Sequence, residues 1–104
     1  MIVQVATFPV RPEKKAEFIA FIEPIIAAGR QEPGLNIYLP TWKSEDENVG
    51  VWIEEYESQA VFDAHMQTEM TQRLVAHLAD YLAAPPEIRV YDVNSVNVQT
   101  FDSF

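Results

Sequence analysis

The residues of this chain with the clearest chemical potential lie in one short stretch, WIEEYESQAVFDAHM, at positions 52–66. The stretch begins with aromatic and β-branched residues typical of a strand, and strand alternation places Trp52, Glu54 and Tyr56 on one face. It ends in a predicted short helix that carries His65. A carboxylate and an imidazole are groups that general acid–base chemistry uses, so this stretch holds a candidate reaction site.

Glu54 and His65 each have a functional and a structural interpretation. Glu54 is expected on the face that packs against helices, where desolvation raises the pKa of a carboxyl group. There it acts as a general base or anchors a substrate hydroxyl, or else it accepts structural hydrogen bonds from helix N–H groups or from His65. His65 is either a proton acceptor or a core histidine bonded to a backbone carbonyl. We interpret both as catalytic candidates, and the sequence leaves the structural alternative open.

Large aromatic side chains near this stretch predict a wall against which a planar molecule stacks. Trp52, Tyr56 and Tyr38 are the first candidates, because aromatic rings pair with planar partners over large areas. The same residues also fill an ordinary helix–sheet core, which is the alternative for each of them. The remaining predicted substrate-binding residues come from the helices and are Phe21, Phe62 and Tyr81.

Composition argues against several other kinds of function. The chain has 104 residues, no cysteine and a net charge of −9, so disulfides, thiolate catalysis, nucleic-acid binding and anionic membrane surfaces are not expected. His65 and His77 are too far apart in sequence for a compact ligand set, and no metal is predicted. The N-terminus lacks the features of a signal peptide, and no apolar run spans a bilayer. A cytoplasmic protein is therefore expected.

Hydrophobic periodicity predicts the elements that position these residues. Pro24 is expected to bend one long helix, and Pro40 indicates a strand at a sheet edge or with a bulge. The charged run 43–50 predicts a turn. The expected strands cover 2–8, 35–42, 49–57 and 87–93, and the expected helices cover 12–29, 58–66 and about 71–84. The order β-α-β-β-α-β is the ferredoxin-like α+β arrangement, an antiparallel sheet with helices on one face.

Both faces of the predicted sheet carry bulky apolar groups, although the helices cover only one. Alternation assigns Leu35, Ile37 and Leu39 to one face, opposite Asn36 and Tyr38. An exposed apolar sheet face is most simply buried by the same face of a second copy. We therefore predict a homodimer, that is, a dimeric α/β barrel.

A domain is predicted over residues 1–93, followed by a C-terminal extension over residues 94–104. The extension is too apolar for a free tail. Val96, Val98 and Phe101 are predicted to pack on the dimer partner.

A family resemblance is carried by the segments VRPEKKAEFIAFIEPIIAAGRQEPG, WIEEYES, VFDAHMQT and EIRVYDV. Together they resemble the antibiotic biosynthesis monooxygenase family over about residues 3–93. The resemblance implies a dimeric α+β barrel protein with a pocket between the helices and the sheet of each subunit. It further implies a monooxygenase that oxidises a small phenolic or quinol molecule with O2 and uses no metal, flavin or haem. Glu54 and His65 match the family pattern, which makes His65 the expected base, aided by Glu54.

Two positions depart from the family pattern. Tyr56 stands where the family usually has tryptophan, and residues 69–71 replace a Pro-His pair. These departures favour an alternative, an isomerase-like or non-catalytic ligand-binding member of the same superfamily. A phosphorylated ligand would need a cation in the pocket, for which Arg89 is the candidate. A third interpretation is a structural protein whose pocket is filled by its own side chains.

Overall fold

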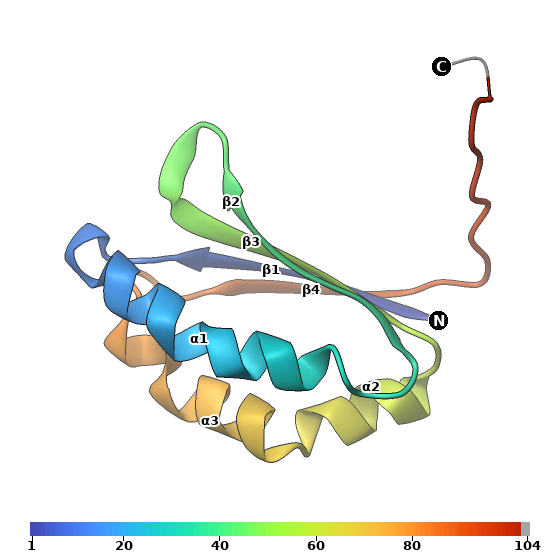
Figure 1. Cartoon of the computed structure of the whole chain (residues 1–104), viewed down its shortest axis with the longest axis horizontal. Coiled ribbons are helices and arrows are strands. Elements are labelled where there is room, and N and C mark those ends of the chain that lie inside the picture. Colours follow the sequence, from blue (N-terminus) through green and yellow to red (C-terminus); the bar gives the residue numbers. More distant parts are fainter. Residues whose placement is uncertain (103–104) are drawn as a thin grey trace.

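The computed structural model describes residues 1–102, which form a four-stranded antiparallel sheet covered on one face by helices (Figure 1). The elements follow in the order β1 (Ile2–Pro9), α1 (Lys15–Gly29), β2 (Leu35–Lys43), β3 (Asp46–Tyr56), α2 (Gln59–Met66), α3 (Glu69–His77) and β4 (Glu87–Asp92), with 3-10 turns at Pro12–Lys14 and Leu78–Asp80. The strand order is β2-β3-β1-β4, with antiparallel neighbours. The predicted ferredoxin-like α+β fold is confirmed.

Helix α1 supplies much of the layer that covers the sheet. Its buried residues, Phe18, Ile22, Ile25 and Gly29, recur at steps of three and four, the period of a single helix face. Pro24 lies inside the helix, which continues through it as predicted. Pro40 likewise lies in β2, an edge strand, where a missing backbone donor is tolerated.

Side-chain caps mark the start of α2 and the start of α3. The Ser58 hydroxyl accepts a hydrogen bond from the Val61 backbone N–H at 3.2 Å and begins α2. The Thr68 hydroxyl accepts from the Thr71 N–H at 3.3 Å and begins α3. Each cap satisfies a donor that the first helical turn leaves without a partner, so the break predicted between the two helices is confirmed.

The end of α3 differs from the sequence prediction. A helix was expected to about residue 84, but α3 ends at His77 and a 3-10 turn follows. Beyond it, Leu82 forms a β-bridge with Val10, and the Ala83 N–H donates to the Pro9 carbonyl at 2.8 Å. The backbone there extends β1 with tertiary hydrogen bonds instead of continuing the helical ladder.

The hairpin between β2 and β3 is tighter than expected. The charged run 43–50 was predicted to be a turn, but β3 already begins at Asp46, which pairs with Lys43. Only Ser44 and Glu45 form the turn. The charged residues that follow lie in an exposed strand, where water solvates them as well as in a loop.

A β-bulge near the start of β2 reverses the predicted facing of Leu35. The register shifts between Leu35 and Ile37, so that Leu35 pairs with Tyr56 while Tyr38 pairs with Glu54. Leu35 and Tyr38 are therefore both buried under the helices, and Asn36 is exposed. The prediction that Leu35 shares a face with Ile37 and Leu39, opposite Tyr38, was wrong, because an inserted residue breaks strict alternation.

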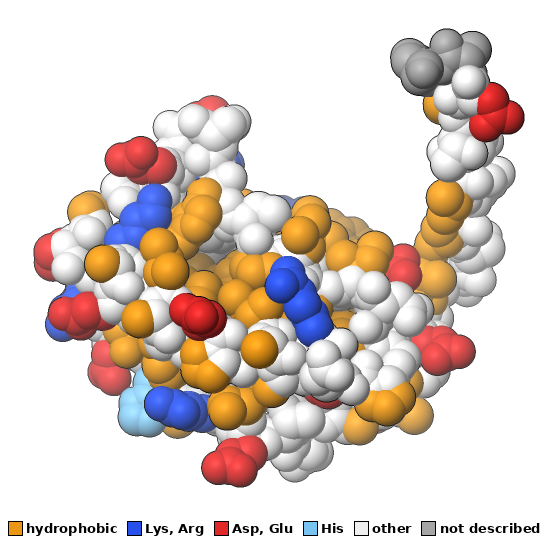
Figure 2. Space-filling model, in the orientation of Figure 1, with side chains coloured by type: hydrophobic (Ala, Val, Ile, Leu, Met, Phe, Trp, Pro, Cys, Tyr) orange, Lys and Arg blue, Asp and Glu red, His pale blue; other side chains and the backbone are white. Residues whose placement is uncertain are grey.

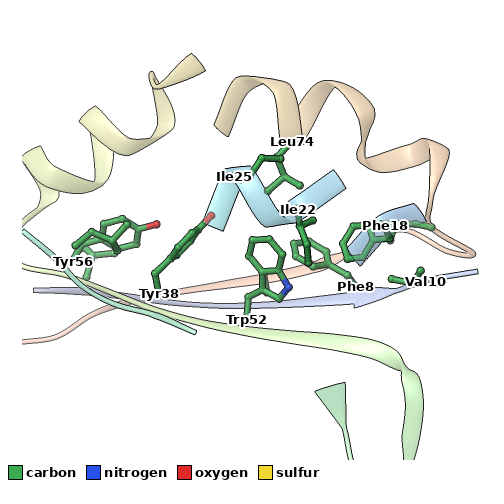
Figure 3. Close-up of a cluster of buried hydrophobic side chains, with 13 residues drawn as sticks. Phe8, Val10, Phe18, Ile22, Ile25, Tyr38, Trp52, Tyr56 and Leu74 are labelled. Carbon is green, nitrogen blue, oxygen red and sulfur yellow. The ribbon is translucent and has the colours of Figure 1, made fainter. Parts of the chain in front are cut away.

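The helix face of the sheet holds the core, from which Tyr38, Trp52 and Tyr56 rise toward the helices (Figure 3). The opposite face is open, and Ile37, Leu39 and Ile53 lie exposed on it. Residues 94–102 contain no helix or strand and project away from the helix layer (Figures 1 and 2). Within residues 1–102, no helix combines the length and apolar character needed to cross a bilayer.

Candidate functional site

A cavity of about 230 Å³ lies between the helix face of the sheet and helices α2 and α3. Trp52 and Glu54 line it from β3, Tyr38 from β2, and His65 from α2. Two depressions are more open. One, of about 430 Å³, adjoins the cavity and shares Val75, Leu78 and Pro86 with it, and the other, of about 410 Å³, lies elsewhere; neither is lined by an imidazole. The cavity of about 230 Å³ is the candidate site because it combines a largely apolar wall with convergent polar groups.

The Glu54 carboxylate is buried, with 3 % of the residue exposed, and two donors hold it. Its Oε2 accepts from Gln4 Nε2 at 3.1 Å, and its Oε1 accepts a hydrogen bond from the Tyr56 hydroxyl. Sheet register explains both contacts, because Gln4 lies directly opposite Glu54 on β1 and Tyr56 lies two residues further along the same face. The carboxylate is thereby fixed at the cavity wall.

The surroundings of Glu54 shift the acidity of three groups. Burial raises the pKa of the Glu54 carboxyl, although the hydrogen bonds from Tyr56 and Gln4 and the nearby His65 act in the opposite direction. Burial and the adjacent Glu54 charge raise the pKa of the Tyr56 phenol, which stays protonated as a donor. Burial, followed by Glu54, likewise raises the pKa of Tyr38.

The raised pKa of Glu54 predicts a specific pH dependence of stability. The folded chain binds this proton more tightly than the unfolded chain, whose carboxyl titrates near 4.5. The contribution of the protonated Glu54 carboxyl to the stability of the fold is complete below that pH, and it is lost as the pH rises through the folded-state pKa. Glu54→Gln preserves the shape and stays neutral, so its free energy of unfolding should rise relative to wild type between about pH 5 and about pH 8.

Urea denaturation at both pH values measures this difference. Glu55→Gln, on the other face of the same strand, is the matched control and should follow the wild type. A constant gap between wild type and Glu54→Gln over this range would contradict the raised pKa.

His65 is buried and has a partner at each ring nitrogen. Nδ1 lies 2.9 and 3.0 Å from the two carboxylate oxygens of Glu32, in the loop between α1 and β2. Nε2 lies 3.2 Å from the Thr71 hydroxyl at the start of α3 and 3.8 Å from Glu54 Oε1. The imidazole thus bridges a loop carboxylate and the carboxyl at the cavity wall. This arrangement can accept a proton from a molecule in the cavity.

The structure brings some predicted site residues together and leaves others outside the cavity. His65, Glu54, Trp52 and Tyr38 line it, whereas Tyr56 contributes only through its hydrogen bond to Glu54. The other three predicted binding residues do not line the cavity. Phe21 and Tyr81 stack on each other with centroids 5.0 Å apart, and Phe62 packs edge-on against Tyr56.

Sequence reasoning missed Gln4, Thr71 and Glu32. Gln4 shares its strand face with the buried Ala6 and Phe8, so a polar residue in that alternation was a usable signal. The capping position of Thr68 would have placed Thr71 on the inner turn of α3. Glu32 gave no such signal, because its partner His65 lies 33 residues away.

The position of Tyr38 depends on a close approach to α1. A Cβ added at Gly29 would lie 2.4 Å from the Tyr38 ring, so only glycine leaves room for the tyrosine there. Tyr38 also lines the cavity, and its ring meets Trp52 in a T-shaped arrangement with centroids 5.8 Å apart. Tyr38 therefore lies between α1 and the cavity.

Arg89, the candidate cation for a phosphorylated ligand, lies away from the cavity. It pairs with Val5 in the register of β1 and β4, on the open face of the sheet, and its side chain is exposed beside Glu87. Within residues 1–102, no three His, Asp or Glu side chains converge in the manner of metal ligands.

The fold and the cavity together define a small ferredoxin-like α+β protein with buried acid–base groups between its layers. The profile of the antibiotic biosynthesis monooxygenase family matches residues 1–77. The chain therefore belongs to this family.

Two individual relatives are similar over most of this chain. The uncharacterized protein sll1783 of Synechocystis is 34% identical over 92 residues, which are 88% of this chain and 63% of the relative. The chain thus spans less than two thirds of that protein. YcnE of Bacillus subtilis, provisionally named a monooxygenase, is 32% identical over 88 residues, 85% of this chain and 93% of YcnE.

Solved structures show the same fold. Rv0793 of Mycobacterium tuberculosis superposes with a TM-score of 0.85 at 21% identity, covering 93% of this chain and 98% of its own. A structure of an antibiotic biosynthesis monooxygenase superposes with a TM-score of 0.83 at 24% identity, covering 91% and 100%.

Proposed function

We propose that this chain is a monooxygenase that oxidises a small phenolic or quinol molecule with O2, without a cofactor, in the cavity between its helices and sheet. One observation carries the proposal: His65 Nε2 and Glu54 Oε1 lie 3.8 Å apart on the wall of a largely apolar cavity. Family membership supports the reaction class.

His65 is the catalytic base in this proposal. Its Nε2 takes the hydroxyl proton of the substrate, and Glu54 binds a second polar group of the same molecule. The electron-rich anion then reduces O2. One oxygen atom enters the substrate and the other leaves as water, so that SH2 and O2 become SO and H2O. The substrate supplies both electron pairs, and no outside reductant is required.

The size and charge of the cavity restrict the substrate class. An apolar protein cavity of about 150 Å³ holds benzene, and this one measures about 230 Å³. A molecule of one or two rings therefore fits. The described wall carries Glu54 and His65 but no lysine or arginine, which favours a neutral phenol over a phosphorylated ligand.

Oxygen consumption with a panel of hydroquinones and naphthoquinols, in buffer treated with a chelator, tests the proposal. The expected result is uptake that saturates with substrate and releases a quinone with one added oxygen atom. Binding of the same compounds without any uptake would instead establish the alternative, a non-catalytic ligand-binding member of the family. If the compounds neither bind nor cause oxygen uptake, the cavity has no role in oxidising or in binding molecules of this class.

We further propose that the chain is a cytoplasmic homodimer. Ile37, Leu39 and Ile53 form an exposed apolar row on the open sheet face, which a second copy would bury. The extension 94–104 would pack on the partner through Val96 and Val98; its residues 103 and 104 lie outside the described part of the chain.

Light scattering is expected to give twice the chain mass, and deleting residues 94–104 is expected to lower the melting temperature of the dimer. A monomer mass would refute the dimer, and an unchanged melting temperature would refute the role of the extension.

A further inference from the structure

Glu32 holds the nitrogen of His65 that faces away from the cavity, and the proposed mechanism so far gives it no role. Both of its carboxylate oxygens accept from Nδ1, at 2.9 and 3.0 Å. The His65 side chain is 4% exposed and the Glu32 side chain 21%, so the pair runs from the protein interior to solvent. Glu32 is therefore the outer end of a chain of polar groups that begins at the cavity wall.

The loop that carries Glu32 is fixed to the segment that carries His65. Gly34 has a φ of +82°, a conformation that glycine adopts without strain. Its carbonyl accepts from the Glu57 N–H at 2.8 Å, just before α2 begins. A Cβ at Gly34 would lie 2.7 Å from the Val61 side chain on α2. The loop and α2 are thus in direct contact, and the backbone sets the geometry of the Glu32–His65 pair.

The contact with Glu32 determines which ring nitrogen carries the lone pair. A neutral imidazole has one N–H donor and one acceptor, and a carboxylate can only accept. With Nδ1 donating to Glu32, Nε2 carries the lone pair and faces the Thr71 hydroxyl at 3.2 Å. The other titratable groups around the ring are Glu54, Tyr38 and Tyr56, and they lie on the Nε2 side or against the ring faces.

We propose that Glu32 is a positioning residue that keeps the lone pair of His65 on the cavity side and connects the ring to solvent. The inference rests on the proposed function, because the proton that reaches Nε2 is the hydroxyl proton of the substrate. The substrate O–H bond breaks as Nε2–H forms, and the positive ring is held against the Glu32 carboxylate. Nε2 later returns that proton to the oxygen that leaves as water, while any exchange with solvent passes through Nδ1 and Glu32.

The tautomer of His65 tests the positioning without reference to catalysis. His77→Gln leaves one histidine in the chain, so nitrogen-15 spectra of labelled imidazole report His65 alone. Under conditions where its shifts show a neutral ring, the proton is expected on Nδ1. Glu32→Ala should move the majority to Nε2–H, the tautomer that an unrestrained histidine favours in water. Glu57→Ala, an exposed acid beside the same loop, is the matched control and should change nothing.

Two results would overturn the positioning. One is a ring protonated on Nε2 while Glu32 is intact. The other is an Nδ1–H majority that survives Glu32→Ala. Glu32→Leu, which fills a similar volume and offers no acceptor to Nδ1, replaces Glu32→Ala if the alanine variant unfolds.

Ionisation of bound 4-nitrophenol tests the proton transfer without oxidation. Its phenolate absorbs at longer wavelength than the phenol, and its electron-poor ring does not reduce O2. We expect the bound probe to ionise in the His77→Gln protein and the ionisation constant to fall about tenfold in Glu32→Gln, since a charged acceptor becomes a neutral one. No fall in Glu32→Gln, an equal fall in Glu57→Ala, or no ionisation in the parent protein would overturn the inference.

These measurements separate the inference from the proposed function. If quinols are not oxidised but the tautomer and the probe depend on Glu32, the proposed function fails and the positioning role stands. If quinols are oxidised and neither readout depends on Glu32, the positioning role fails and the proposed function stands.

Discussion

Replacing His65 by alanine is expected to lower kcat for quinol-dependent oxygen uptake by about 10²–10⁴-fold, the usual contribution of a positioned base. The imidazole is the group whose Nε2 faces both the cavity and Glu54, at 3.8 Å from the carboxylate. No other described imidazole reaches the cavity, because His77 is exposed beside Asp80. The fold should persist, since the Glu32 carboxylate left behind is partly exposed and can be hydrated.

Stopped-flow and electrode measurements of oxygen uptake, with far-ultraviolet circular dichroism as a check on folding, measure this effect. His77→Ala is the control and should retain the wild-type rate. Added imidazole should restore part of the activity of His65→Ala, because the substitution leaves space for the ring at the cavity wall. An undiminished rate in a folded His65→Ala protein would remove His65 from the mechanism.

Replacing Trp52 by alanine is expected to destabilise the chain by about 3–5 kcal/mol, the range for large aromatic residues in cores. Trp52 is 2 % exposed and lies at the centre of the sheet's helix face. Its ring meets Phe8 and Tyr38 edge-on, with centroids 5.2 and 5.8 Å away. Removing it deletes these contacts and merges its volume with the adjacent cavity, which the surrounding strands cannot close. The loss is a large share of the roughly 5–15 kcal/mol that a domain typically has.

Urea denaturation followed by circular dichroism measures the loss, and Trp42→Ala is the matched control. Trp42 is only partly buried on the edge strand β2, where it contacts Phe18 and Lys15, so its replacement should cost clearly less. Indole added to Trp52→Ala should raise its midpoint, because a ligand that binds only the folded state stabilises it. Equal losses in the two variants would show that Trp52 is not central to the core.

Local periodicity was sufficient to predict the order of the elements and the burial of several residues of the candidate site. The three- and four-residue spacing of Phe18, Ile22 and Ile25 identified α1, and the alternation of Trp52 and Glu54 identified the buried face of β3. Both signals work because burial on one side of a regular element imposes its repeat on the sequence. His65 followed from its place on a short capped helix next to that strand.

Features that depend on tertiary contacts could not be predicted in this way. The bulge that turns Leu35 inward has no residue signature in an otherwise regular strand. The early end of α3 depends on the bridge from Leu82 to Val10, far apart in the chain. Glu32 was not singled out, since nothing local indicates that its carboxylate meets His65 across 33 residues.

The absence of a side chain at Gly29 gives the protein a way to change its ligand preference from outside the binding site. Tyr38 forms one wall of the cavity, and its rear edge occupies the space that a Cβ at position 29 would need. A larger residue there would displace the Tyr38 ring and change the volume of the cavity, without changing the identity of any residue that lines it. Selectivity for molecular size can therefore evolve separately from the acid–base chemistry, through a helix position that never touches the bound molecule.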